Sequence, residues 1–241
     1  MGGVFARGLL RAGYPVYPVT RGSAMEPLAA HLSDPSMVLV AVAESELHDV
    51  LAAIPAAWRS RLALLQNELL PRDWQRHGLD QPTIISVWFE KKNGQEAKEI
   101  MASPAYGPRA GILCAALSAV DLGCRELPDA ATLLHELVLK NLYILTTNIA
   151  GLEVGGTVGE LWLRHEALAR EIATDVLQIQ EWLAGMPLDH DALIAGMLDA
   201  FRGDPEHKCM GRSAPARLRR ALALADEAGL AVAVLRRIEG A

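Results

Sequence analysis

Lys140 is the residue whose type and surroundings point most directly to chemistry. It lies in a strongly apolar stretch, between Leu139 and Leu142, and burial there would lower the pKa of its ammonium group toward neutral pH. Such a group can donate a hydrogen bond or a proton to an oxygen on which negative charge builds during a reaction. Asn148 follows two helical turns later, so one helix would direct both side chains to the same side. The alternative is a lysine whose stem lies along the core while its charge reaches water.

The first residues, Met1-Gly2-Gly3, stand directly before a helical pattern. Dinucleotide-binding domains begin with a strand, a glycine-rich loop and a helix whose amino end holds the pyrophosphate. Gly2 would be the last glycine of such a loop, which predicts that the strand and two further glycines lie before Met1. The alternative is an ordinary first helix with a glycine start.

Arg21 ends the next expected strand. At this point of a dinucleotide-binding domain, an Asp or Glu binds the ribose hydroxyls of NAD, whereas an Arg accommodates the 2′-phosphate of NADP. The arginine therefore favours NADP(H), with an ordinary solvated surface arginine as the alternative.

The hydrophobic pattern predicts an α/β Rossmann-like dinucleotide-binding domain, with its first strand missing, followed by an all-α C-terminal domain. Buried parallel strands alternate with helices in the first part, and alanine- and leucine-rich helices dominate after about Ala110. We place the join near Gly107–Pro108, which gives domains 1–108 and 109–241. The expected strands are 16–20, 37–42, 62–65 and 83–89. The expected helices are 2–12, 45–54, 110–122, 130–150, 161–184, 189–201 and 214–229.

Composition excludes several classes of protein. The 241 residues are 51% hydrophobic and carry a net charge of −6, which argues against a nucleic-acid partner. We assign the basic cluster 212–220 to a solvated helix face. The three cysteines form no CxxC pair and fit a reducing compartment, and neither a signal peptide nor a membrane-spanning segment is indicated. We expect a cytoplasmic protein. Asp189-His190-Asp191 is interpreted as a helix cap, so no metal site is predicted.

The chain resembles the ketopantoate reductases, also called 2-dehydropantoate 2-reductases. Residues 64–67, Leu-Leu-Gln-Asn, are similar to a family strand that ends in an Asn. Lys140, Asn148 and the Gly-Glu-Leu stretch at 159–161 keep the family's spacing, and 219–229 resembles its late helix. The opening glycines and Arg21 also stand where the family has its glycine loop and its NADP-selecting arginine.

This resemblance implies NADPH-dependent reduction of a small 2-oxo acid, such as 2-dehydropantoate to pantoate in pantothenate biosynthesis. It implies that Lys140 is catalytic and that Gly2, Arg21 and Asn67 bind the cofactor. It also implies that Asn67, Asn148 and Ser213 bind the substrate. The expected partners are a 2-oxo acid, with neither nucleic acid nor membrane, and a homodimer is compatible with them.

Four departures from the family leave other hypotheses open. Ala43 and Ile144 replace a Lys and an Asn, Ser213 replaces an acidic residue that completes the active site, and Glu68 replaces a Gly. These losses put the family's own substrate in doubt. One alternative is a non-catalytic relative that acts in binding or assembly. Another hypothesis is that Met1 is an internal methionine of a longer chain.

Overall fold

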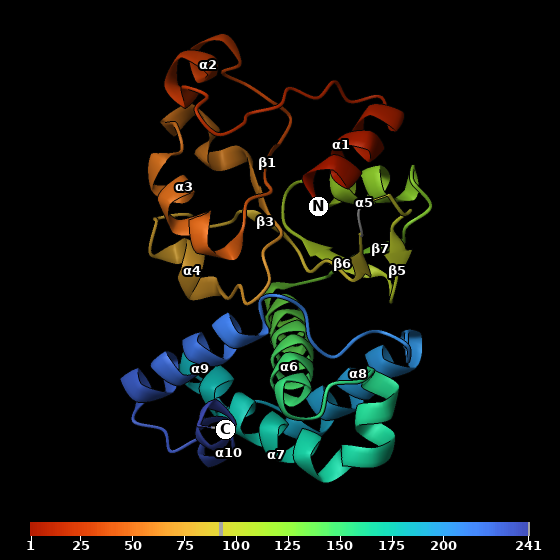
Figure 1. Ribbon diagram of the computed structural model, residues 1–241. Helices are drawn as coiled ribbons and strands as arrows, with labels where there is room; N and C mark the ends of the chain where they lie inside the picture. Colours follow the sequence, from red (N-terminus) through yellow and green to blue (C-terminus); the bar gives the residue numbers. More distant parts are fainter. Residues whose placement is uncertain (92–93, 241) are drawn as a thin grey trace. The chain divides into compact units, whose positions relative to one another are not determined.

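The computed structural model describes residues 1–91 and 94–240 and divides the chain into two compact units, Met1–Glu136 and Leu137–Ala241 (Figure 1). The predicted join lay earlier, near Gly107–Pro108. In the structure α5 (Ala110–Ser118) and β7 (Cys124–Glu126) belong to the first unit, because β7 completes its sheet and α5 packs against α1 (Gly2–Arg11).

The first unit contains a five-stranded, mostly parallel sheet with the order β1-β2-β3-β6-β7. The strands β1 (Val38–Val40), β2 (Leu62–Leu64) and β3 (Thr83–Ile85) run parallel, as their continuous apolar runs predict. The antiparallel partner of β3 is β6 (Ser103–Tyr106), which in turn pairs parallel with β7. Two short strands, β4 (Phe89–Glu90) and β5 (Lys98–Glu99), form a separate antiparallel pair.

Helices pack on both sides of this sheet (Figure 1). On one side α1 lies against α5, and Phe5 of α1 reaches the core around Ile85 and Leu113. Gly8 permits this approach, because a Cβ atom there would stand 2.1 Å from the carbonyl oxygen of Ala116. The other helical segments of the unit are α2 (Met25–His31), η1 (Glu44–Glu46), α3 (Leu47–Ala53), η2 (Ala56–Arg61) and α4 (Pro71–Gln75).

The predicted strand 16–20 is wrong. The segment has no regular secondary structure and pairs with none of the described strands. Pro15 and Pro18 lack the N–H groups that a sheet ladder needs, and Tyr17 and Val19 are exposed. The predicted run 83–89 is also divided, because the chain leaves the main sheet after Ile85 and starts β4 at Phe89.

The second unit is helical, as predicted. It contains most of α6 (Ala130–Val154) together with α7 (Val158–Ala184), α8 (His190–Gly203), α9 (Ala214–Ala228) and α10 (Ala233–Glu239). Asp189 caps α8 by accepting a hydrogen bond from the backbone N–H of Ala192, and Gly229 ends α9 in the left-handed conformation. None of the helices in the described part of the chain has the length and apolarity needed to cross a membrane.

Cys114 and Cys124 form a thiol pair that the sequence did not indicate. They lie on α5 and β7, both are half-buried, and their thiols share a hydrogen bond. Burial raises the pKa of both thiols, which keeps them protonated and unreactive toward alkylation near neutral pH.

In alkaline solution, where the thiols begin to ionise and the thiolate is the reactive form, we expect the thiol oxidant diamide to take one hydrogen from each thiol and link Cys114 to Cys124. The tryptic peptide 110–125 would then be lighter by two hydrogen atoms in a mass spectrum and would resist alkylation until reduced. Cys209, which is buried in the second unit, should keep its thiol. A peptide 110–125 that still carries two alkyl groups after diamide treatment would contradict this expectation.

Candidate functional site

The amino end of α1 lies beside the loop that leaves β1. A Cβ atom added at Gly2 would stand 3.3 Å from Cβ of Ala41, so the helix start and this loop are in close contact. The first N–H groups of a helix have no acceptor within the helix, and they attract phosphate. This end of α1 therefore fits a phosphate group of a dinucleotide.

Two side chains join the carboxyl ends of β1 and β2. Gln66 donates from Nε2 to the carbonyl oxygen of Val40 at 2.7 Å and accepts from the backbone N–H of Leu65. The next residue, Asn67, donates from Nδ2 to Oε1 of Glu44 at 3.0 Å. The edge of the sheet at which parallel α/β folds bind ligands is thus fixed by a buried glutamine and carries Asn67 beside a carboxylate.

Arg21, the second predicted cofactor residue, forms an ion pair with Glu46 of η1. The arginine side chain is highly exposed. The short helix η1 therefore holds both predicted cofactor side chains, Asn67 through Glu44 and Arg21 through Glu46. The structure brings Arg21 and Asn67 to the same short segment of the first unit, although they are 46 positions apart in the sequence.

Glu68 adopts a backbone conformation that favours glycine. Its φ is 61°, which lies in the left-handed region where a side chain other than that of Gly, Asn or Asp is uncommon. The ketopantoate reductases have a Gly at the position that Glu68 resembles. The turn after β2 therefore keeps a glycine-like backbone with a charged side chain on it.

Lys140 is buried on α6 of the second unit, with 8% of its surface exposed. Burial, and then the positive charge of Arg217, lower the pKa of Lys140 from 10.5 to about 7. Its ammonium group also stands 5.5 Å from the ring centre of Tyr143, a distance typical of a cation–π contact. At neutral pH this lysine is poised between its charged and neutral forms, which suits a proton donor.

Asn148 binds protein groups at both ends of its amide. Its Oδ1 accepts a hydrogen bond from Nη1 of Arg217 at 2.8 Å, and its Nδ2 donates to the carbonyl oxygen of Cys209 at 3.1 Å. Asn148 is almost fully buried. It therefore fixes the arginine of α9 relative to α6 and to the segment before α9.

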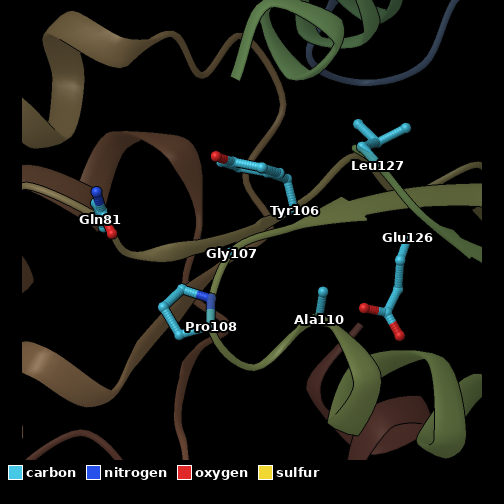
Figure 2. Close-up of a pocket in the computed structure, with 7 residues that line it drawn as sticks. All are labelled: Gln81, Tyr106, Gly107, Pro108, Ala110, Glu126 and Leu127. Atoms are coloured by element: carbon cyan, nitrogen blue, oxygen red, sulfur yellow. The ribbon is translucent and has the colours of Figure 1, made fainter. Parts of the chain in front are cut away.

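A cavity of about 210 Å³ lies at a different place in the first unit (Figure 2). Figure 2 shows Tyr106, Glu126 and Gln81 among the seven residues that line it. Because β6 runs antiparallel to β3, Tyr106 lies at the amino ends of the parallel strands, at the edge opposite to Asn67. None of the predicted site residues lines this cavity.

Comparison with known proteins shows the fold. Neither a known family model nor a curated protein sequence matches the chain. A ketopantoate reductase from Ralstonia eutropha JMP134 is similar in structure, with a TM-score of 0.63, 16% identity and coverage of 98% of this chain and 92% of that one. For a 2-dehydropantoate 2-reductase from Methylococcus capsulatus the TM-score is 0.66, the identity 13% and the coverage 99% and 91%. The chain has the ketopantoate reductase fold.

A D-mandelate dehydrogenase solved with NADH is also similar, with a TM-score of 0.66, 15% identity and coverage of 100% of this chain and 93% of that one. The ketopantoate reductase fold that the sequence predicted is thus confirmed for nearly the whole chain. The TM-scores of 0.63 to 0.66 establish the fold. The roles of the site residues follow from their own geometry.

Within the ketopantoate reductase fold, the structure adds one residue that the sequence analysis missed. Ser213, predicted to bind substrate, is exposed at the N-cap position of α9 and makes no capping hydrogen bond with its side chain. Arg217 lies one turn later and contacts Asn148. The sequence pattern places Arg217 in a basic cluster that is predicted to face solvent. Its position one helical turn after Ser213, a predicted site residue, was the signal that could have identified it.

Proposed function

We propose that the chain is an NADPH-dependent reductase of a small 2-oxo acid and that Lys140 is its proton donor. The observation that carries the proposal is the buried Lys140, whose lowered pKa of about 7 occurs in a chain with the ketopantoate reductase fold. Similarity in fold to D-mandelate dehydrogenase with NADH also supports a nicotinamide cofactor and a 2-hydroxy acid product. Reduction of 2-dehydropantoate is the specific case that the resemblance favours.

Each residue has a defined task in this reaction. A nicotinamide cofactor, when bound, would supply the hydride that reduces the keto carbon of the substrate. As charge builds on the keto oxygen, the Lys140 ammonium donates a hydrogen bond and then its proton, which yields the hydroxyl group and a neutral amine. In the first unit, the amino end of α1 at Gly2 would bind a cofactor phosphate, Asn67 would contact the cofactor and Arg21 would bind the 2′-phosphate.

The alternative is a non-catalytic binding protein. It draws support from Glu44 and Glu46, whose carboxylates hold Asn67 and Arg21. Steady consumption of NADPH in the presence of a 2-oxo acid, followed by absorbance, would exclude this alternative. Failure of the purified protein to oxidise NADPH with a panel of 2-oxo acids would contradict the proposed function.

The Arg21→Ala variant is expected to weaken NADPH binding by about 10–100-fold while NADH binding changes little. A hydrogen bond to a charged group contributes about 1.5–3 kcal/mol, and only NADPH has the 2′-phosphate that Arg21 would bind. Titration of both cofactors by calorimetry measures the effect.

Glu46→Gln is the matched comparison for this titration, because it releases Arg21 from its ion pair and keeps the arginine. This variant should bind NADPH at least as tightly as the parent protein. If Arg21→Ala lowered the affinity for NADPH and for NADH by the same factor, Arg21 would not be the residue that selects the 2′-phosphate.

A further inference from the structure

Two histidines of the first unit, His48 and His77, lie in direct contact and are not among the predicted site residues. His48 is the second residue of α3, and His77 lies in the turn directly after α4, the helix next to α3 in Figure 1. Nδ1 of His48 and Nε2 of His77 are 3.0 Å apart, and the two rings stack with their centres 5.3 Å apart. Both residues are half-buried, so protons from solvent can reach them.

The hydrogen bonds of His48 assign the position of its proton. Arg76, the C-cap residue of α4, donates from Nε to Nδ1 of His48 at 3.1 Å. A guanidinium has no acceptor atom, so Nδ1 of His48 carries no proton and the neutral ring bears its proton on Nε2. The contact with His77 then requires the Nε2–H group of His77 as the donor. One nitrogen of His48 therefore accepts two hydrogen bonds, and both exist only while His48 is uncharged.

Charged groups from both helices surround His48. Burial, and then the positive charge of Arg76, lower the pKa of His48, and His77 acts in the same direction. Two carboxylates oppose this effect: Asp73, whose Oδ1 lies 3.9 Å from Nε2 of His48, and Asp49 of α3. The balance favours the uncharged ring that the hydrogen bonds require.

The groups around His77 act in a similar way. Burial, and then the charges of Arg76 and Arg59, lower the pKa of His77, whereas Asp73 raises it. Arg59 also donates a hydrogen bond to the carbonyl oxygen of His77, which joins η2 to the same turn. A proton added to Nδ1 of His48 would face the N–H groups of Arg76 and His77. Both hydrogen bonds to Nδ1 would then be lost.

The histidine pair joins the two segments that carry the predicted cofactor side chains. Helix η1, whose carboxylates hold Arg21 and Asn67, ends at Glu46, two residues before His48. The turn that bears Asn67 leads directly into α4 at Pro71. Separation of α3 from the end of α4 would therefore loosen the contacts of Arg21 and Asn67.

We propose that His48 and His77 form a pH-sensitive latch, which holds α3 and η1 against the end of α4 at neutral pH and releases them in mildly acidic solution. The latch is independent of the proposed function, and only its effect on a dinucleotide rests on that function. Released histidines have a pKa of about 6.5, and the latched histidines have a lower pKa. The open form therefore binds more protons and is favoured as the pH falls below about 6.5.

Hydrogen–deuterium exchange of residues 47–53 at pH 7.5 and pH 5.5 tests the latch. After correction for the intrinsic pH dependence of exchange, the protection of these amides should fall by about 10-fold at pH 5.5. This is the factor by which one proton favours an open form with a pKa of about 6.5. His48→Asn keeps an oxygen acceptor at the δ position and cannot be protonated, so its protection should stay constant.

His31→Asn is the matched control, because His31 is an exposed histidine of α2. This variant should lose protection in acid as the parent protein does. Constant protection in the parent protein, or a fall of equal size in His48→Asn, would overturn the proposal.

Nitrogen-15 NMR of the imidazole rings tests the latch in the parent protein without any variant. At pH 7.5 the ring of His48 should carry its proton on Nε2 and none on Nδ1. Its pKa, followed in the same spectra, should lie below 6.5. A proton on Nδ1 of His48 at pH 7.5 would leave no acceptor for Arg76 and would overturn the latch.

Calorimetry with NADP⁺ tests the effect on the proposed cofactor site. Between pH 7.5 and pH 5.5 the affinity should fall more in the parent protein than in His48→Asn, a comparison in which the ionisation of the cofactor phosphate cancels. An equal fall in both proteins would overturn the link between the latch and the cofactor site. A protein that binds no dinucleotide at either pH would contradict the proposed function, and hydrogen exchange would still decide the latch.

Discussion

Lys140→Met is expected to lower kcat for 2-oxo acid reduction by roughly 100–10,000-fold, the usual contribution of a general acid. Methionine fills a similar volume without a proton to donate, so the fold should persist. The exposed Lys208 provides the control, because Lys208→Met removes a lysine from the same unit without touching a buried group. Steady-state kinetics of the three proteins measure the effect. A Lys140→Met variant with the parent kcat would remove Lys140 from the mechanism.

The pKa of Lys140 gives this prediction a second readout. Because the charged form donates the proton, kcat/KM of the parent protein should fall as the pH rises above about 7.

Lys140 should also make the stability of the protein depend on pH. The folded protein releases the proton near pH 7, whereas the unfolded chain keeps it until about pH 10.4. Between these values the unfolded state binds more protons, so the free energy of unfolding should increase with pH.

The expected increase is on the order of 5 kcal/mol, from a pKa lowered from 10.5 to about 7. Below pH 7 the cost of the buried charge is fully present, and Lys140→Met should then be more stable than the parent protein. Urea unfolding of both proteins at pH 6 and pH 9 tests this. A parent protein with the same pH dependence as Lys140→Met would show that Lys140 is not buried as a charged group.

Gly8→Ala is expected to destabilise the first unit by about 2–4 kcal/mol, as overpacking against a rigid neighbour does. The added Cβ would stand 2.1 Å from the carbonyl oxygen of Ala116, and both groups belong to helix backbones that cannot yield separately. Gly3→Ala on the same helix is the matched control, because no atom lies within 4 Å of its added Cβ. Gly3→Ala should gain about 0.5–1 kcal/mol from helix propensity.

Urea unfolding of the two variants and the parent protein should therefore give changes of opposite sign. A Gly8→Ala protein as stable as Gly3→Ala would mean that α1 and α5 are not in backbone contact.

The strongest local patterns determined which elements could be predicted. The continuous apolar runs of β1 and β2 and the long periodic segments of α6 and α7 are evident without any knowledge of partners. Strand β7 was missed because two of its three residues are exposed, which leaves little hydrophobic pattern. The false strand at 16–20 shows the converse, since β-forming residues need a neighbouring strand to form a ladder.

Candidate site residues were predicted less completely than the fold, for a related reason. Lys140 and Asn148 share a helix, so spacing alone places them together. Arg217 is 69 positions from Asn148, and its neighbours in the sequence are other arginines that face solvent. Only the hydrogen bond to Asn148 in the folded chain distinguishes Arg217 from the neighbouring arginines. The carboxylates of Glu44 and Glu46 beside Asn67 and Arg21 were missed for the same reason.

The ion pair of Arg21 with Glu46 also bears on how fast a cofactor is captured. Electrostatic steering accelerates the encounter of charged molecules when a protein surface projects uncompensated charge. Glu46 neutralises Arg21, so an approaching phosphate is attracted only at short range. Because the phosphate must then compete with a carboxylate already in place, a doubly charged phosphate has an advantage over an uncharged ribose hydroxyl. At the proposed dinucleotide site, discrimination between cofactors is therefore gained at the expense of association rate.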